Sequence, residues 1–235
     1  MDFKKYKYRT ELHAHTNPAS PCSDFEAKDV VMKYAELGYD SLVVSNHFFP
    51  DMQFVEDKDR CIREYLKDYD EAQKVGEKLG INVILGCEMR FTENHNDYLV
   101  YGIDRDFFEL AYDSMNKGLQ SFSKQVRGGN AVLIQAHPFR DWCVVAPAEL
   151  LDGVEVYNLH PGHNSKVGLA AKYAQSNDLL VTSGTDFHHE GHQGMTALLT
   201  KEELKTSFDV ARVLKSRDYL IEVSGSVIVP FVNLK

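Results

Sequence analysis

The strongest constraint on the fold of this chain is a repeated alternation of two kinds of segment. Short apolar runs rich in β-branched residues, which are typical of strands, alternate with longer segments of helical periodicity. The helical segments at about 27–37 and 57–79 are each followed by a glycine, which is a common stop signal. Repeated βα units of this kind predict an α/β fold with parallel strands. We expect strands at about 10–12, 40–47, 82–91, 97–104, 131–139, 152–158 and 178–187, and further helical regions at 107–128 and 165–176.

Seven strands in 235 residues suit a compact βα barrel better than an open sheet, although periodicity alone does not separate the two. We therefore expect a distorted seven-stranded (β/α)7 barrel similar to a TIM barrel. A chain of this length can bury the core of one large domain, so we expect a single domain over residues 1–235.

Composition and charge narrow the class of protein. The net charge of −9 argues against a broad basic surface for duplex nucleic acid, while a local basic pocket for one phosphate stays open. The first residues contain no apolar export signal, and no long apolar run predicts a membrane span. The sparse cysteines lack CxxC spacing, which fits a reducing compartment and predicts a cytoplasmic protein; they are Cys22, Cys61, Cys87 and Cys143.

Residues of the metal-ligand type follow one strand after another. In a parallel barrel the carboxyl ends of the strands meet on one face, where active sites lie. Imidazole and carboxylate groups suit Zn, Mn or Fe, and the set exceeds the ligands that one ion needs, so we expect two or three divalent ions. The residues at or just after the strand ends are His13, His15, His47, Glu88, His137, Glu155, Asp186 and His188.

Each of these residues has an ordinary explanation when it is taken alone. Any strand can place two histidines on one face, as in His13 and His15, and His47 or His137 could be a satisfied core histidine. Glu88 is harder to explain, because a carboxylate after an apolar run is costly to bury without a metal or a cation. The recurrence of ligand types at the same end of at least five strands favours a metal centre.

Other histidines and two arginines have open roles. His95 is either a loop residue or a further ligand, and we expect solvent-facing positions for His160 and His163 in a Pro-Gly turn. His189 and His192 lie close enough to Asp186 to touch substrate, or else lie on the surface. Arg90 and Arg140 follow Glu88 and His137 closely, so each is either a phosphate clamp or part of a salt bridge.

The ordered motifs ELHAHT, SNH, GCEMRF, QAHPFR, GVEVYN and SGTDFHH make this sequence resemble the PHP (polymerase and histidinol phosphatase) superfamily. The resemblance extends from His13 to about Gly194 and implies a distorted seven-stranded barrel with three metal ions that cleaves phosphomonoesters or phosphodiesters. It implies that Glu88 bridges a first metal to a second. The other implied ligands are His13, His15 and Asp186 for the first metal, His137 for the second, and His47 with His188 for the third.

The sequence departs from the family pattern at three places. The usual Thr-Asp-His is Ser45-Asn46-His47, which removes a carboxylate that supports the third metal. The loop after His15 is long, and we choose Asp24 as its ligand with Cys22 as the alternative. The expected second ligand between Glu88 and His137 has no clear match, which leaves His95 open.

The expected activity is metal-dependent hydrolysis of a small phosphorylated substrate or nucleotide. Water between the metals bridged by Glu88 would attack, Arg140 or Arg90 would bind phosphate oxygens, and Asp186 or a pocket histidine would handle protons. One alternative is an amidohydrolase-type enzyme, which usually has a metal-bridging lysine where this chain has Glu88. Another is a noncatalytic metal-binding or regulatory module. Substrate, metal identity and oligomeric state stay open.

Overall fold

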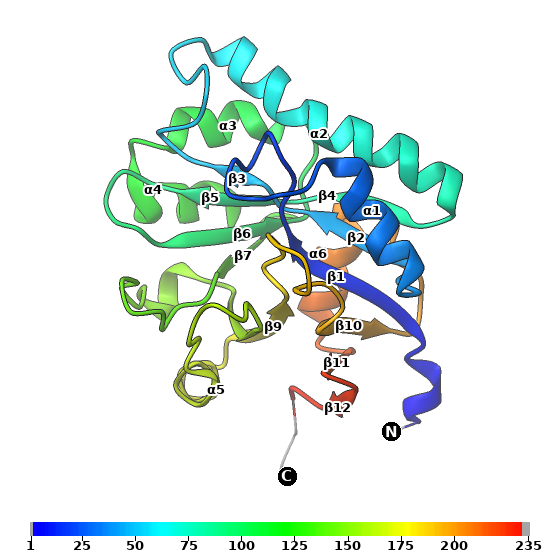
Figure 1. Cartoon of the computed structure of the whole chain (residues 1–235). Coiled ribbons are helices and arrows are strands. Elements are labelled where there is room, and N and C mark those ends of the chain that lie inside the picture. Colours follow the sequence, from blue (N-terminus) through cyan, green and yellow to red (C-terminus); the bar gives the residue numbers. More distant parts are fainter. Residues whose placement is uncertain (1, 232–235) are drawn as a thin grey trace.

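The strands form two six-stranded sheets in the computed structural model, which describes residues 2–231 (Figure 1). Met1 and residues 232–235 of the expected domain lie outside the described residues. The first sheet has the order β12 (Ser226–Ile228), β11 (Leu220–Val223), β10 (Thr196–Thr200), β1 (Tyr8–Ala14), β2 (Ser41–Val44) and β4 (Asn82–Leu85). The second has the order β3 (His47–Phe48), β5 (Cys87–Arg90), β6 (Asp97–Tyr101), β7 (Val132–Gln135), β8 (Gly153–Asn158) and β9 (Leu180–Gly184).

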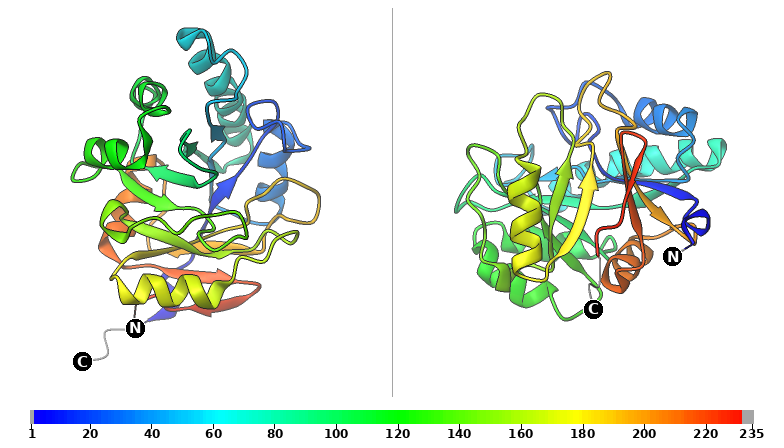
Figure 2. Two further views of the ribbon diagram at one scale, coloured as in Figure 1. Left: turned by 90° about the vertical axis from the view of Figure 1, so that its left-hand side faces the viewer. Right: turned by 90° about the horizontal axis from the view of Figure 1, so that it is seen from below.

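Six α-helices cover these sheets within the described residues: α1 (Ala27–Glu36), α2 (Lys58–Leu79), α3 (Phe107–Ser114), α4 (Gly118–Val126), α5 (Val167–Ser176) and α6 (Ser207–Ser216). Short 3-10 turns occupy Phe3–Lys5 and Ala148–Leu150. Helices α1 and α2 pack against each other, and α5 packs along β8 (Figures 1 and 2). The helices expected at 27–37, 57–79 and 165–176 are confirmed to within about two residues. The region expected at 107–128 is two helices, because Gly118 has φ +76° and interrupts a continuous helix.

The closed seven-stranded barrel is not what the hydrogen-bond ladders show. Strands β2 and β3 follow each other directly, as do β4 and β5, so the chain passes twice from the first sheet to the second. Between β9 and β1, however, the described residues show only an isolated bridge that joins Ala14 to Phe187. Asp186 has φ +52°, so the chain turns after β9 before a ladder with β1 can form. The fold is therefore mixed α/β with two sheets that are not closed.

The direction of β6 differs from the expected parallel arrangement. It is antiparallel to both of its neighbours, β5 and β7. Only residues 91–96 connect β5 to β6, and a parallel crossover needs a dozen residues or more. As a result the beginning of β6, and not its end, lies beside the carboxyl ends of β5 and β7, where Asp97 stands opposite Arg90.

Buried aromatic residues support the strands that carry the candidate ligands. Phe48 of β3 packs edge to face against Tyr65 of α2, at 5.1 Å between ring centroids, and both rings contact Phe108 of α3. Tyr65 also donates a hydrogen bond of 2.7 Å to the carbonyl of Asn46. These contacts fix the segment immediately before His47. None of the helices in the described part of the chain has the length and apolar character needed to cross a membrane.

Candidate metal centre

The carboxylate of Glu88 lies at the middle of a group of imidazoles. His13 lies in β1 and His15 is the residue just after its end, so the alternation of the strand places both on one face. The parallel pairing of β3 with β5 sets His47 beside Glu88. Glu88 Oε1 lies 3.2 Å from His13 Nε2 and 3.4 Å from His137 Nε2. Glu88 Oε2 lies 3.3 Å from His15 Nε2 and 2.8 Å from His47 Nδ1. A single buried carboxylate thus faces four ring nitrogens.

Asp186 approaches two of the same nitrogens. Its Oδ1 lies 3.4 Å from His13 Nε2 and 3.3 Å from His15 Nε2. His188 follows two residues later, with its Nδ1 2.8 Å from the carbonyl oxygen of Asp186. The rings of His15 and His188 stack at 4.3 Å between centroids. The expected ligands His13, His15, His47, Glu88, His137, Asp186 and His188 are therefore brought together.

The unpartnered atoms of this cluster test whether metal ions fit it. His13 Nε2, His15 Nε2 and both carboxylate oxygens of Glu88 are buried and have no hydrogen-bond partner. Leaving buried polar atoms unpaired costs about 1–3 kcal/mol each, and more when they are charged. Three groups have donor atoms close enough to share an ion: His13, His15 and Glu88; His15, His47 and His188; and His47, Glu88 and Asp97. The donors are the nitrogen and oxygen types that suit Zn, Mn or Fe, so the residues fit metal ions.

The far sides of the two β1 imidazoles are held by hydrogen bonds. His13 Nδ1 lies 2.9 Å from Glu155 Oε1, and His15 Nδ1 lies 3.1 Å from the Ser20 hydroxyl. Glu155 also accepts a bond of 3.1 Å from the backbone N–H of His137. Sequence reasoning placed Glu155 at the strand ends with the ligands, and the structure gives it a supporting position behind His13.

The charges of the cluster perturb the pKa values of its members. Burial alone would raise the pKa of Glu88, but the neighbouring His13 and His47 hold it well below the ordinary value. Burial works against ionisation of Asp186 in the same way, and His13 with Arg140 keeps the pKa of Asp186 well below the ordinary value. Burial and the nearby His188 and His47 lower the pKa of His15. Both carboxylates are therefore ionised and His15 is neutral. Burial opposes protonation of His13 and His47, but the neighbouring carboxylates raise the pKa of both rings well above the ordinary value, so metal ligation would require these two rings to lose a proton.

Asp97 is a site residue that sequence reasoning missed. It is 3% exposed, shares a possible ion position with His47 and Glu88, and has Oδ2 3.9 Å from His137 Nε2. It stands between Glu88 and His137 in the chain, where the expected second ligand had no match. The signal available in the sequence was the short 91–96 connection, which favours a hairpin and brings the first residue of the next strand back to the site.

The loop after His15 presents Cys22, and not Asp24, to the group formed by His15, His47 and His188. The Cys22 thiol forms hydrogen bonds with His188 and His47; burial opposes its ionisation, but these contacts lower its pKa to about 6. The Asp24 side chain is 64% exposed and lies 2.8 Å from His189 Nδ1. The geometry therefore favours the alternative ligand over the one chosen from the sequence.

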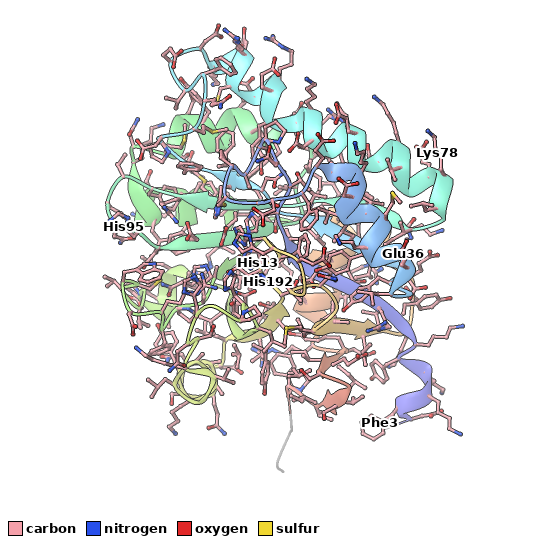
Figure 3. The ribbon with its side chains drawn as sticks, viewed as in Figure 1. Phe3, His13, Glu36, Lys78, His95 and His192 are labelled. Carbon is pink, nitrogen blue, oxygen red and sulfur yellow. The ribbon has the colours of Figure 1, made fainter. Side chains whose placement is uncertain are left out.

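The remaining candidates separate into three positions. His95 is exposed and lies at the edge of the molecule, away from His13 (Figure 3). Arg90 donates from Nε and Nη2 to the two oxygens of Asp97 at 2.7 and 2.8 Å, so the salt bridge describes it better than a free clamp. Arg140 is 8% exposed, contacts Asp186 and Asn158 through Nη2, and has a buried Nε without a partner.

Planar rings lie beside His188, on the partly exposed side of the cluster, which we call its mouth. His160, which is half-buried, lies 5.7 Å from the His188 ring and 4.6 Å from the His192 ring. Burial lowers the pKa of His160 to about 3, so this ring is neutral. Trp142 is 53% exposed and meets His163 edge to face at 5.3 Å. The mouth is therefore bordered by planar rings, beyond a strongly charged interior.

The family assignment agrees with this geometry. A family model described as the PHP domain matches residues 11–227, which is most of the chain. The chain therefore belongs to the PHP domain family. A search among curated proteins found no match.

Solved structures support the fold. A two-domain protein from Bacteroides vulgatus that contains a predicted PHP-like metal-dependent phosphoesterase is similar with a TM-score of 0.63 and 16% identity over 92% of this chain, which spans 64% of that protein. A proposed metal-dependent phosphoesterase from Bifidobacterium adolescentis gives 0.51 and 17% identity, covering 88% of this chain and 95% of the other. An amidohydrolase from Chromobacterium violaceum, solved with sulfate and no metal, gives 0.57 and 14%, covering 92% and 98%. At these identities the likeness concerns the fold.

Proposed function

We propose that this protein is a metal-dependent phosphoesterase that hydrolyses a phosphomonoester or phosphodiester of a small molecule or nucleotide. The observation that supports this most strongly is that His13, His15 and Glu88 each place one buried ligand atom within 4.8 Å of the others, and that these atoms make no hydrogen bond. Membership of the PHP domain family supports the same class of chemistry.

In this proposal the centre holds two or three ions of Zn, Mn or Fe, with Glu88 shared between the first and the second. His13, His15 and Asp186 complete the first position. His137 and Asp97 complete the second, in which Asp97 takes the place left open by the sequence pattern. His47 and His188 hold the third, with Cys22 as the loop ligand in preference to Asp24, because only Cys22 contacts both imidazoles.

Bound ions would neutralise the substrate phosphate and supply activated water at neutral pH. The chain's own groups would position the ester. The buried Nε of Arg140 has no partner and can donate to a phosphate oxygen, while its Nη2 stays on Asp186 and Asn158. Arg90 acts mainly by holding Asp97. Asp186 or a histidine of the mouth accepts or donates protons, and the rings of Trp142 and His163 border the organic part of the substrate.

A second candidate is hydrolysis of an amide or lactone, because the Chromobacterium violaceum amidohydrolase has the same fold. Two observations favour phosphate esters over this candidate. Glu88 occupies the position where amidohydrolases usually carry a metal-bridging lysine, and the unpartnered Arg140 Nε suits an anionic group. A noncatalytic metal-binding module would have the same ligands and no turnover.

A substrate panel separates these possibilities. The protein, prepared with Mn, Zn or Fe supplied, is tested on phosphomonoesters, phosphodiesters, nucleotides, amides and lactones, and its metal content is measured by elemental analysis. We expect at least two ions per chain and turnover of phosphate esters, with the exposed Glu77→Gln as a matched control for Glu88→Gln. Turnover of amides or lactones alone supports the second candidate. Metal without any turnover supports the noncatalytic module.

A further inference from the structure

Asn46 has no hydrogen bond to the imidazole of His47, although it stands where the resembled family has an aspartate. Its side chain instead faces the loop after β1. Asn46 Oδ1 accepts bonds from the Thr16 backbone N–H at 2.7 Å and from the Ser20 hydroxyl at 2.9 Å. Asn46 Nδ2 donates to Thr16 Oγ1 at 2.8 Å. The residue is a link between other groups and supplies no charge of its own.

A buried carboxylate lies at the end of this link. Asp68 belongs to the core-facing side of α2, in line with Tyr65 and Ala72, and is 2% exposed. No lysine or arginine forms an ion pair with it among residues 2–231. Its Oδ2 accepts bonds of 2.9 Å from the Thr16 hydroxyl and from the Ala19 backbone N–H. A buried carboxylate without a cation is costly, so a position like this calls for a role.

The hydrogen bonds run without a break from Asp68 to a candidate metal ligand. Thr16 Oγ1 connects Asp68 to Asn46, Asn46 connects to Ser20, and the Ser20 hydroxyl lies 3.1 Å from His15 Nδ1. The Ser20 oxygen also accepts a bond of 2.9 Å from the His47 backbone N–H. The four links join helix α2 to the last residues of β1.

Groups that can only donate or only accept a hydrogen bond fix the direction of every bond in this series. The Thr16 N–H can only donate, so the atom of Asn46 that faces it is Oδ1 and the other is the NH2 group. The Asp68 carboxylate can only accept, so the Thr16 hydroxyl proton points to it. The Ser20 hydroxyl proton must lie between Ser20 and Asn46 Oδ1, since two oxygen lone pairs at 2.9 Å would repel each other. The remaining lone pair of Ser20 then requires a proton on His15 Nδ1.

We propose that Asp68 is a positioning residue of the metal centre, which fixes the tautomer and orientation of His15 through Thr16, Asn46 and Ser20. With its proton on Nδ1, His15 presents the lone pair of Nε2 to Glu88 and Asp186. A buried carboxylate of α2 thus acts on a candidate ligand across three intervening side chains. This inference rests on the proposed metal centre, because it explains how one of its ligands is prepared.

The first test follows the tautomer of His15 in the metal-free protein. Nitrogen-15 NMR of the histidine rings at pH 8, with His15→Gln used for assignment, should show His15 in the Nδ1–H form. Asp68→Asn keeps the shape and removes the charge, and Thr16→Val cuts the chain at its second group. Both should shift His15 toward a mixture of tautomers. Thr16→Ser retains the hydroxyl and should restore the wild-type signal. Glu71→Gln, an exposed change one turn along α2, is the matched control.

The second test measures metal affinity by competition of Zn²⁺ or Mn²⁺ with a chelator. Loss of a group that supports a ligand typically weakens metal binding about 10–100-fold, which we expect for Asp68→Asn and Thr16→Val but not for Thr16→Ser or Glu71→Gln. Thermal unfolding identifies any variant that fails to fold. If Asp68→Asn does not fold, the comparison of Thr16→Val with Thr16→Ser decides whether the inference holds. Wild-type tautomer in both Asp68→Asn and Thr16→Val would overturn the inference. The NMR measurement needs neither metal nor turnover. Failure of this inference can therefore be distinguished from failure of the proposed activity.

Discussion

At the scale of single residues, Glu88 is the candidate ligand that faces the largest number of other candidate ligands. Each of its oxygens faces two imidazoles at 2.8 to 3.4 Å, and neither oxygen makes a well-aligned hydrogen bond with them. In the proposed centre this carboxylate supplies negative charge to two ions and fixes their separation. His188, in contrast, belongs to only one of the three ligand groups.

We expect Glu88→Gln to lower metal content and turnover together, because the amide keeps the shape and removes the charge. The loss should exceed the roughly 10–100-fold effect of removing a supporting group. His188→Ala should mainly empty the third position and leave residual activity. Elemental analysis and steady-state kinetics on the same preparations measure both effects. Full metal content with near-normal turnover in Glu88→Gln would show that the bridge is misassigned.

The two arginines should respond differently to neutralisation. Arg140→Gln removes the unpartnered Nε donor and the Nη2 bond to Asp186, so we expect KM for phosphate esters to rise or kcat to fall. The loss of metal should be smaller than in Arg90→Gln, because Asp186 keeps its bond from Asn158. Arg90→Gln frees Asp97 from its two hydrogen bonds, and the expected loss is in metal retention. Kinetics and elemental analysis separate the effects. The roles would be reversed if Arg90→Gln changed only KM and Arg140→Gln lost metal.

At the scale of elements, Glu11 joins β1 to the segment that follows β9. Its carboxyl group is completely buried, and it accepts bonds from the backbone N–H groups of His13 and Thr185 and from the Thr185 hydroxyl. Burial raises the pKa of Glu11 to about 7, even though these hydrogen bonds act in the opposite direction. A proton on Glu11 is therefore retained by the folded protein at a pH where an unfolded chain has lost it.

This difference makes stability depend on pH. The stabilisation from Glu11 is complete below its ordinary pKa of 4.5 and is lost as pH rises toward the folded value of about 7. The loss amounts to about 3 kcal/mol, from roughly 1.4 kcal/mol per pKa unit. Denaturant unfolding of the metal-free protein between pH 4.5 and 7.5 should show that Glu11→Gln removes this part of the decline. Parallel curves for wild type and variant would contradict it.

Much of the element order could be predicted from the sequence, and the exceptions have physical causes. The helices α1, α2 and α5 have clear periodicity and end signals, so their positions are confirmed. Strand β6 is buried along its whole length, and the apolar run that follows Asp97 carries no information about direction. The direction follows only from the length of the 91–96 connection, and Asp97 was missed with it. Helix α6, which begins with a capping box of Thr206 and Asp209, and strands β10–β12 lay beyond the last expected strand.

The candidate metal ligands were easier to predict from the sequence than the residues that contact them. A strand end followed by histidine or carboxylate is visible in the sequence, and seven such residues meet in the structure. The choice between Cys22 and Asp24 depended on how a long loop folds, which no local pattern specifies. The bidentate pairing of Arg90 with Asp97 depended on the antiparallel register of β5 and β6, which the expected parallel order excluded.

At the scale of the whole molecule, the proposed centre lies where the two sheets meet. His13 belongs to the first sheet and His15 directly follows its strand β1, whereas His47, Glu88 and Asp97 belong to the second. Ions held by both sets would act as cross-links between the sheets. Without ions, the buried atoms of Glu88, His13 and His15 have no well-aligned hydrogen bonds and depend on ion pairs with one another, which weakens the same boundary.

Metal removal should therefore destabilise the entire fold. An ion present at 100 times its Kd stabilises the folded state by about 2.7 kcal/mol. For a domain of this size that corresponds to a fall in Tm on the order of 5–10 °C after chelation. Calorimetry before and after treatment with a chelator, followed by addition of Zn²⁺ or Mn²⁺, measures the change and its reversal. An unchanged Tm, with loss of metal verified by elemental analysis, would contradict the cross-linking role.

An isolated bridge between Ala14 and Phe187 connects β1 to the segment that follows β9. We expect this connection to open locally, because no continuous ladder supports it. Two backbone bonds flank it, from His15 N–H to the Phe187 carbonyl at 3.1 Å and from Phe187 N–H to the His13 carbonyl at 3.3 Å. Opening there would draw Asp186 away from His13 and His15, so it offers a route by which ions enter and leave. Amide deuterium exchange at 13–16 and 185–188 should accordingly be fast in metal-free protein and slow once metal is bound. The amides shared by β6 and β7 should exchange at the same rate in both states, because their ladder is continuous.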